Sequence, residues 1–208
     1  SVISRADGTA QISYVDVGGE PARHGKTISG TISGTAITFG TPLVFAAAST
    51  REVSSAYIGN DKQVIAFKDN ANATAGTAVV NQIGSTNLTA ENYVGMSGGP
   101  DKSLPATLGT GVVFESAATS IIGSTFDSNS NRIVISYRDD ANSDYGTAVV
   151  GTVSGTSISF GTPVVFESAA YAQAEEGITF DSNSNKVVIA YNDGGNNQYA
   201  TAIVGTVN

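Results

Sequence analysis

The sequence predicts an all-β protein, a β-propeller made of four-stranded antiparallel blades, and three observations lead to this fold class. The segment at residues 126–137, Phe-Asp-Ser-Asn-Ser-Asn-Arg-Ile-Val-Ile-Ser-Tyr, returns 54 residues later at residues 180–191 with few changes. The chain is rich in Gly, Ser, Thr and Val and poor in the helix formers Leu, Lys, Glu and Met. Short apolar runs alternate with turn residues. An internal period of about 52 residues is close to the size of one propeller blade.

The second of these copies is the clearest repeat, and it predicts three strands, over residues 177–181, 186–191 and 199–207. Residues 182–185, Ser-Asn-Ser-Asn, predict the first turn, because these side chains bond to turn backbone and Asn tolerates positive φ. The preceding repeat adds a fourth, outer strand over residues 156–166. The strand at 186–191 is apolar at consecutive positions, which predicts burial on both faces, as between neighbouring blades.

Aligned copies of that apolar strand define four repeat units of about 52 residues. Their aromatic anchors recur at intervals of 53, 70 and 54 residues: Tyr14, Phe67, Tyr137 and Tyr191. The long middle interval contains a Pro- and Gly-rich stretch that is typical of a linker. We therefore expect units one and two over residues 1–98, a linker over residues 99–108, and an extra outer strand with units three and four over residues 109–208, all in one propeller domain.

The outer strands are less regular than the rest of the repeat. Residues 36–45 supply one for unit one and residues 157–166 one for unit three, whereas residues 87–96 are a divergent candidate in unit two. Residues 109–117 form an extra outer strand, and unit four has none in this sequence. Three interpretations stay open: a rearranged propeller that closes on itself, rings that close between subunits, and a long loop beside a three-stranded fourth blade.

One Asp recurs two residues after the aromatic anchor of every unit: Asp16, Asp69, Asp139 and Asp193. In a ring of blades these carboxylates would lie on one face, where they could accept hydrogen bonds from sugar hydroxyls or bind Ca²⁺ through oxygen. The alternative is that each carboxylate accepts N–H groups of its own turn. Recurrence in every unit favours this structural alternative.

A second recurring position directly precedes the third strand of each unit: His24, Ala75, Tyr145 and Tyr199. Three of these four side chains can stack or hydrogen-bond, and a ring beside Asp and Asn is a pattern that suits a carbohydrate. The alternative is a Tyr that covers its own loop. The oxygen-rich loops at residues 139–144 and 193–197 lack the EF-hand spacing. Weak Ca²⁺ binding is therefore the only metal interpretation, and no cofactor is expected.

Charge and motifs exclude several classes of function. The net charge is −8 and the Lys and Arg residues are scattered, which argues against nucleic-acid binding. No apolar run is long enough to insert into a membrane. The chain has no Cys and no nucleophile-elbow, zincin or phosphate-loop motif. We therefore expect no enzyme activity. The one catalytic alternative is a sialidase-like glycoside hydrolase, which would need a cluster of arginines.

The amino-acid sequence of residues 146–169 and 180–191 resembles propeller-like repeats in tail-fibre and adhesin-type proteins of marine phages and marine metagenomes. The resemblance covers most of the chain. It implies an extracellular or virion-surface location and contact with a receptor or glycan, and it carries no catalytic residues. Residues 87–95 look like the junction at which such arrays pass into a following domain.

Together these observations predict a non-catalytic binding module that contacts a glycan or a host receptor through the loops between the second and third strands. The alternative is a purely structural or self-assembling repeat protein, natural or engineered. A homo-oligomer formed by strand exchange is compatible with both functions. The binding function and the structural function predict different orientations of the recurring Asp and Tyr side chains. In the structural alternative these side chains turn inward and bond to their own loops.

Overall fold

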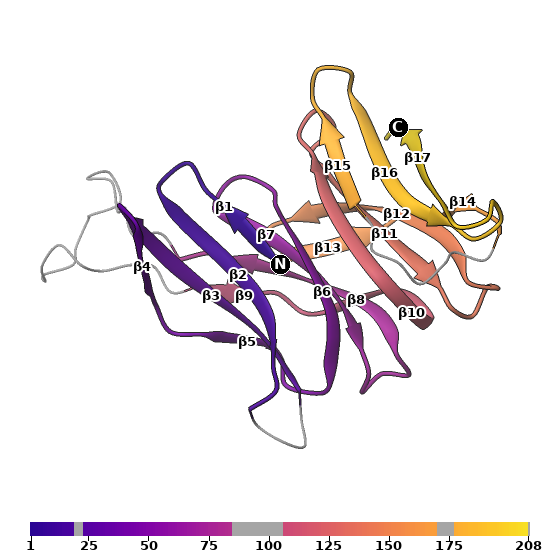
Figure 1. Ribbon diagram of the computed structural model, residues 1–208. Helices are drawn as coiled ribbons and strands as arrows, with labels where there is room; N and C mark the ends of the chain where they lie inside the picture. The colour runs from indigo at the N-terminus through magenta and orange to yellow at the C-terminus, as the bar shows by residue number, and fades with distance from the viewer. Residues whose placement is uncertain (19–22, 85–105, 170–176, 208) are drawn as a thin grey trace, which may run out of the picture.

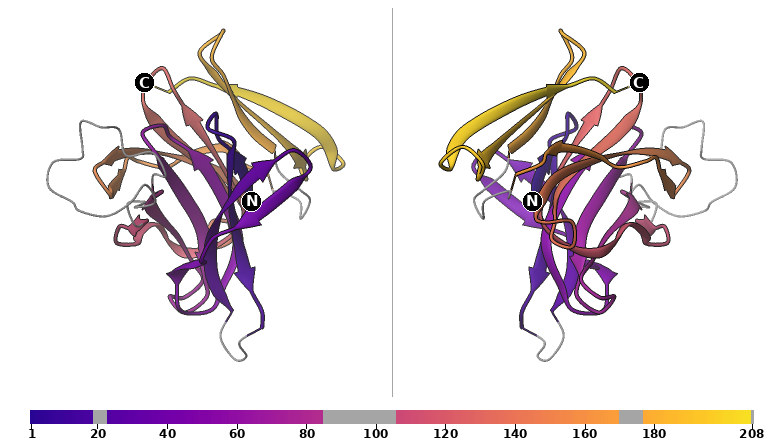
Figure 2. Two further views of the ribbon diagram at one scale, coloured as in Figure 1. Left: turned by 90° about the vertical axis from the view of Figure 1, so that its left-hand side faces the viewer. Right: turned by 90° about the vertical axis from the view of Figure 1, so that its right-hand side faces the viewer.

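The computed structural model describes residues 1–18, 23–84, 106–169 and 177–207, and all regular structure in these ranges is β-strand (Figure 1). The strands form three antiparallel sheets of five, nine and three strands. The predicted all-β class is therefore confirmed. Within the described ranges the sheets form an open stack, with the first repeat (indigo) and the last (yellow) toward opposite ends in Figure 1. Figure 2 shows the stack from two further sides, with the last three strands at the top.

Unit one is the five-stranded sheet. Its strands are β1 (Val2–Ser4), β2 (Thr9–Asp16), β3 (His24–Ser33), β4 (Ala36–Phe39) and β5 (Leu43–Ala46). The first three strands pair in chain order, and both β4 and β5 pair with the other edge of β3. The outer strand of this unit is therefore split into two short pieces.

Units two and three share the nine-stranded sheet. Its strands are β6 (Thr50–Tyr57), β7 (Lys62–Asp69), β8 (Ala75–Gln82), β9 (Thr107–Leu108), β10 (Val112–Asp127), β11 (Arg132–Asp139), β12 (Tyr145–Ser154), β13 (Ser157–Phe160) and β14 (Val164–Glu167). The long strand β10 belongs to both units, because its start pairs with β8 and its later part pairs with β11. Register shifts between Val113 and Ala118 mark the change of partner.

Unit four is the three-stranded sheet, in the order β15 (Gly177–Asp181), β16 (Lys186–Asp193) and β17 (Tyr199–Gly205). The central strand β16 pairs with both neighbours in continuous antiparallel register. Among the described residues, β17 pairs with β16 alone and its other edge is free.

The outer strands of units one, two and three follow one plan. Two pieces pair with the third strand of the unit: β4 and β5 with β3, β9 and the start of β10 with β8, and β13 and β14 with β12. The stretch at residues 109–117 therefore supplies the outer strand of unit two within the same chain. Residues 107–108, at the end of the expected linker, form β9. The divergent candidate at residues 87–96 lies outside the described residues.

The Ser-Asn-Ser-Asn turns form where the sequence predicts them. The last residue of each turn has positive φ, 56° at Asn131 and 57° at Asn185, which Asn tolerates. The Asp before each turn, Asp127 or Asp181, accepts the backbone N–H two residues later, at 2.9 and 3.0 Å. Local side-chain chemistry therefore determines these two hairpins.

The units stack face to face, and alternate residues of a strand pack against opposite neighbours. We call the side of a unit toward the preceding unit its leading face and the other side its trailing face. In β11, Ile135 and Tyr137 of the leading face pack toward unit two, whereas Val134 of the trailing face packs toward unit four. In β7, Ile65 and Phe67 form the leading face and pack with residues of unit one. The core of the protein is thus a series of layers between the sheets.

A Phe of the outer strand lies over a Gly of the third strand in three units: Phe45 over Gly25, Phe114 over Gly76 and Phe166 over Gly146. A Cβ atom on these glycines would lie 2.3, 2.4 and 2.7 Å from the ring. Each ring also contacts the aromatic anchor of the following unit, at centroid distances of 5.2, 5.3 and 5.5 Å: Phe67, Tyr137 and Tyr191. Such aromatic pairs contribute about 0.5–1.5 kcal/mol each beyond burial. The close approach at Gly thus lets one unit reach the next.

A second glycine position tests this layered packing. A Cβ atom on Gly151 of β12 would lie 2.6 Å from Ile133 and 2.9 Å from Phe160, whereas one on Gly205 of β17 would meet nothing within 4 Å. We expect Gly151→Ala to lower the free energy of unfolding by about 1–3 kcal/mol, because the core must move. We expect Gly205→Ala to change it by less than about 0.5 kcal/mol. Urea unfolding measures both, and equal losses would contradict the packing described.

Candidate functional site

The predicted site residues lie where the second and third strands of each unit meet their connecting loop. In the antiparallel register each recurring Asp faces the second recurring position of its own unit: Asp16 opposite His24, Asp69 opposite Ala75, Asp139 opposite Tyr145 and Asp193 opposite Tyr199. The structure therefore brings the two predicted positions together in all four units.

The recurring Asp residues bond within their own loops. In units one to three, Oδ1 accepts a backbone N–H of the loop: Asp16 from Gly18 at 2.9 Å, Asp69 from Ala71 at 3.1 Å and Asp139 from Asn142 at 3.1 Å. In unit four the main-chain carbonyl of Asp193 accepts the N–H groups of Asn196 and Gln198, and its carboxylate accepts the Thr201 hydroxyl at 3.4 Å. This arrangement is the one that the structural interpretation expects.

The four loops nevertheless differ in their electrostatics. Asp16 accepts a hydrogen bond from Nζ of Lys26, and this contact lowers the pKa of Asp16 and raises the pKa of Lys26. Asp139 is buried, and desolvation followed by the nearby Glu115 carboxylate raises its pKa. One Asp is therefore held in its charged form, whereas another is shifted toward its neutral form, although both occupy the same place in the repeat.

The second recurring position is not equally accessible in the four units. Ala75 is fully buried, whereas His24 and Tyr145 are half-buried. Tyr199 has 61% of its surface exposed. The loop of unit four therefore offers the most accessible ring of the four equivalent positions.

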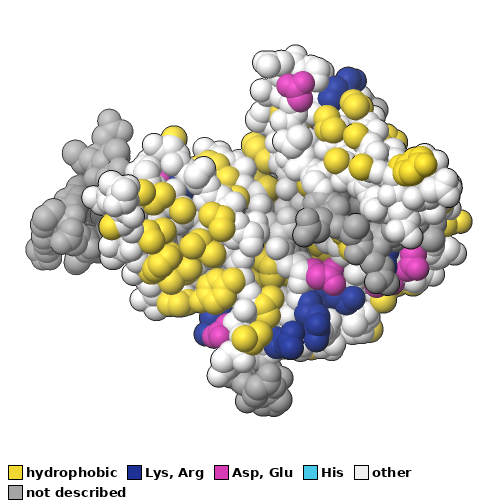
Figure 3. Space-filling model, viewed as in Figure 1, with side chains coloured by type: hydrophobic (Ala, Val, Ile, Leu, Met, Phe, Trp, Pro, Cys, Tyr) yellow, Lys and Arg dark blue, Asp and Glu magenta, His cyan; other side chains and the backbone are white. Residues whose placement is uncertain are grey.

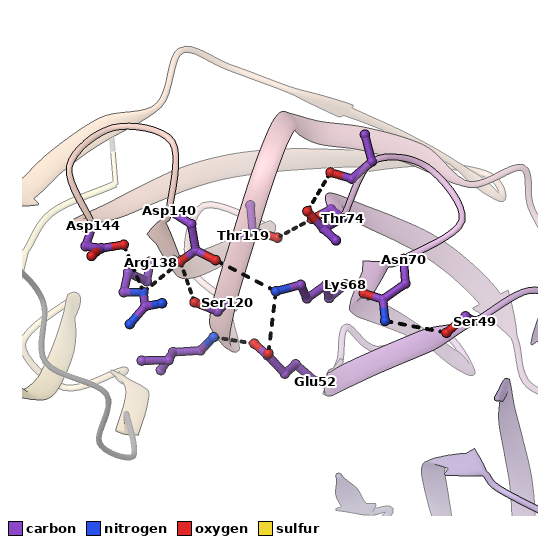
Figure 4. Close-up of polar contacts among 12 residues, drawn as sticks. Ser49, Glu52, Lys68, Asn70, Thr74, Thr119, Ser120, Arg138, Asp140 and Asp144 are labelled. Carbon is purple, nitrogen blue, oxygen red and sulfur yellow. Dashed lines mark hydrogen bonds and ion pairs between the residues drawn. The ribbon is translucent and has the colours of Figure 1, made fainter.

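Sequence reasoning missed a polar network that joins units two and three (Figure 4). Asp140 lies at its centre: it accepts the Ser120 hydroxyl at 2.6 Å and Nε of Arg138 at 2.7 Å, and Nζ of Lys68 lies 3.7 Å away. Glu52 lies 4.0 Å from the same Lys68 nitrogen. The network combines charges of both signs beside the bend of β10, so it holds the two units together. The only sign of this network in the sequence was that a second Asp, Asp140, directly follows Asp139.

A second missed contact links the aromatic anchors to the outer strands. The Tyr137 hydroxyl donates to Glu115 at 3.4 Å, and the Tyr191 hydroxyl donates to Glu167 at 3.0 Å. Burial, with this hydrogen bond and the Glu167 charge, raises the pKa of Tyr191 to about 12. A second oxygen of Glu167 accepts the Ala169 backbone N–H at 2.7 Å. These carboxylates therefore accept hydrogen bonds from buried hydroxyl groups of the following unit.

No group of three or more His, Cys, Asp or Glu side chains among the described residues could hold a metal ion. Arg5 pairs with Asp7 and Asp61, whereas Arg138 pairs with Asp140 and Asp144, so these two arginines lie in separate ion-pair networks. In the described ranges, no helix has the length and apolar character that crossing a membrane requires.

The chain matches no protein-family model, no curated protein and no solved structure.

The raised pKa of Asp139 gives a pH-dependent prediction. Because the folded protein holds this proton more tightly than the unfolded chain does, the charged carboxylate lowers stability at neutral pH, and the penalty disappears as the pH falls through the raised pKa toward 3.8. We expect Asp139→Asn, which keeps an acceptor oxygen, to be more stable than the native chain at pH 7 and to lose that advantage in acid.

Urea unfolding of both proteins between pH 4 and 8 measures this difference. The control Asp139→Ala removes the charge and also the acceptor for the Asn142 N–H, so its free energy of unfolding should lie about 1–3 kcal/mol below that of Asp139→Asn at every pH. A constant difference between Asp139→Asn and the native chain across the pH range would contradict the assignment.

Proposed function

We propose that this chain is a non-catalytic, self-assembling repeat protein whose units act as blades of a propeller-type array. The observation that carries the proposal is a match between two accessible faces. On its trailing face, unit four has the same residues that unit two buries against unit three. On its leading face, unit one has apolar residues at the positions that unit three uses to contact unit two.

The trailing face of unit two consists of two cross-strand pairs, Val64 with Val80 and Ala66 with Ala78, and all four side chains are 0% exposed. Unit four has the same residues in the same register: Val188 with Val204 and Ala190 with Ala202. Here Val204 is 60% exposed, and both alanines are exposed. The same four apolar side chains are therefore fully buried in unit two, whereas in unit four three of them are exposed and Val188 is half-buried.

The leading face of unit three receives unit two through a set of apolar residues: Ile133, Ile135, Tyr137, Val149 and Ile158. The positions equivalent in register in unit one are also apolar or aromatic: Ala10, Ile12, Tyr14, Ile28 and Ile37. Ile32, Ile37 and Phe39 are 48, 42 and 51% exposed, and Figure 3 shows hydrophobic side chains gathered over this sheet. Contiguous apolar patches of this kind are typical of interaction surfaces.

Head-to-tail contact between the two faces would bury residues that water now reaches. Full burial of one Val side chain contributes about 1.5–3 kcal/mol, so a face of several apolar residues supports a stable interface. A contact between different faces closes a ring when the rotation per subunit allows it and otherwise extends a filament. The predicted propeller ring is therefore proposed as an assembly of chains, and the open stack of one chain is a segment of it.

The test is the solution mass by light scattering after size exclusion. We expect the native chain to have a mass that is a multiple of 21.1 kDa. Ala190→Glu places a charge in the middle of the trailing face and should return the mass to that of one chain, because burial of an unpaired carboxylate costs several kcal/mol. The matched control Ala71→Glu, in an exposed loop, should assemble like the native chain.

A second variant distinguishes head-to-tail assembly from a dimer that uses one face twice. Ile37→Glu changes the leading face of unit one and leaves unit four untouched. Head-to-tail assembly requires that Ile37→Glu and Ala190→Glu both disrupt it. A native chain that stays at 21.1 kDa at high concentration, or disruption by Ala190→Glu alone, would overturn the proposal.

One observation supports a second candidate, recognition of a glycan or host receptor by an extracellular or virion-surface protein. Tyr199, 61% exposed, faces Asp193 across the strand pair and offers a ring and oxygen acceptors side by side. We expect Tyr199→Ala to weaken binding to a glycan array at least about tenfold, about 1.4 kcal/mol. Tyr145→Ala, at the half-buried equivalent position, should weaken it less. Absence of glycan binding by the native chain would contradict this candidate.

A further inference from the structure

An apolar cavity of about 200 Å³ lies between units three and four. Unit three lines it with Val134, Val150 and Phe166, and unit four with Ile203, Gly205 and Val207, among others. The cavity therefore adjoins the end of β17, the strand whose outer edge is free among the described residues.

In units one and three, part of the outer strand occupies the position that corresponds to this cavity. Gly151 of β12 lies opposite Ile133 in the register, and the side chains of Ile158 and Phe160 from β13 cover it, with atoms 3.2 and 2.9 Å from a Cβ built there.

Gly30 of β3 is covered in the same way by Ile37 and Phe39 from β4, at 2.6 and 3.3 Å. In both units an outer strand with the sequence Ile-x-Phe therefore lies on the glycine.

Gly205 is the equivalent glycine of unit four, since it lies opposite Val187 as Gly151 lies opposite Ile133. A Cβ atom built on Gly205 meets nothing within 4 Å. Unit four thus has the glycine, the apolar lining and the free backbone edge of this arrangement, and lacks the outer strand among the described residues.

We propose that the β17 edge and this cavity form an acceptor site for an extended peptide strand that carries an Ile-x-Phe pair. The strand would add antiparallel to β17, with its Phe opposite Gly205 as Phe160 lies opposite Gly151. Backbone hydrogen bonds to a free edge supply affinity in such strand addition, and pockets for alternate side chains supply specificity. The site lies between units three and four, and it shares Val204 with the proposed trailing face, but it does not use Ala190 or Ile37 and does not require the assembly.

The other end of β17 limits what the site accepts. In units one to three, Gly25, Gly76 and Gly146 lie under the Phe of the second piece of the outer strand, namely Phe45, Phe114 and Phe166. The equivalent residue in unit four is Ala200. On Gly146, a Cβ atom would come within 2.7 Å of that ring. Ala200 carries such a Cβ. The site therefore takes the Ile-x-Phe half of an outer strand and disfavours the Val-Val-Phe half.

Two synthetic peptides with sequences from this chain test the site. The short peptide, residues 156–161 (Thr-Ser-Ile-Ser-Phe-Gly), carries the Ile-x-Phe pair, and the long peptide, residues 156–167, adds Thr-Pro-Val-Val-Phe-Glu. Titration into the full-length protein is followed by the NMR amide signals of residues 205–207. Light scattering of the same samples reports self-association separately, so failure of the assembly proposal and failure of this one are distinguishable.

We expect saturable binding of the short peptide and none when its Ile and Phe are replaced by Ser. Gly205→Ala, whose side chain would occupy the site, should weaken binding about tenfold or more, about 1.4 kcal/mol. The matched control Gly177→Ala, a β15 glycine that also has nothing within 4 Å, should bind like the native protein. Ala200→Gly should strengthen binding of the long peptide and leave the short one unchanged.

Three results would overturn the proposal. One is no saturable binding of either peptide at millimolar concentration. Another is equal affinity of the native protein and Gly205→Ala, which would indicate that the peptide replaces β13 of unit three or binds elsewhere. The third is equal binding of the Ser-substituted peptide, which would show that a free edge alone, and not the cavity, accounts for the affinity.

Discussion

The rest of the structure depends on one close approach, between an outer-strand Phe and a third-strand Gly of the same unit. Cβ atoms at Gly25, Gly76 and Gly146 would lie within 2.7 Å of a ring. Because the glycine leaves room, the ring extends past its own sheet and reaches the aromatic anchor of the next unit, at centroid distances of 5.2 to 5.5 Å. Cohesion is therefore pairwise, from each unit to its neighbour, as in other repeat proteins.

The same contact explains how the repeats diverge. Tyr137 and Tyr191 have hydroxyl groups, and Glu115 and Glu167 lie within hydrogen-bond distance of them. At the junction of units one and two the anchor is Phe67, and Ala46 stands where the other units have Glu. Burial of a hydroxyl or a carboxylate without a partner costs free energy. The aromatic anchor of one unit and the outer-strand residue of the preceding unit are therefore either both polar, as Tyr with Glu, or both apolar, as Phe67 with Ala46.

Features determined by neighbouring residues could be predicted from the sequence, and features determined by stacking could not. The Ser-Asn-Ser-Asn turns and the pairing of Asp139 with Tyr145 follow from local spacing, and the structure contains both. The partner of residues 109–117 could not be predicted, because β8 is distant in sequence and no local signal marks the pairing. The network around Asp140 was missed for the same reason, since Lys68 reaches it only when units two and three stack.

The order of the units is determined by the chemistry of their faces. Gln63 of unit two is 0% exposed and donates to Thr27 of unit one at 2.9 Å, at a face that also buries Gln11. The four apolar side chains of the two trailing pairs in unit four, Val188 with Val204 and Ala190 with Ala202, would leave the Gln63 amide without this partner, which disfavours contact with unit two. Unit one has Ala10 at the position of Gln63. These contacts support the proposal that the trailing face of unit four contacts unit one of another chain and not unit two.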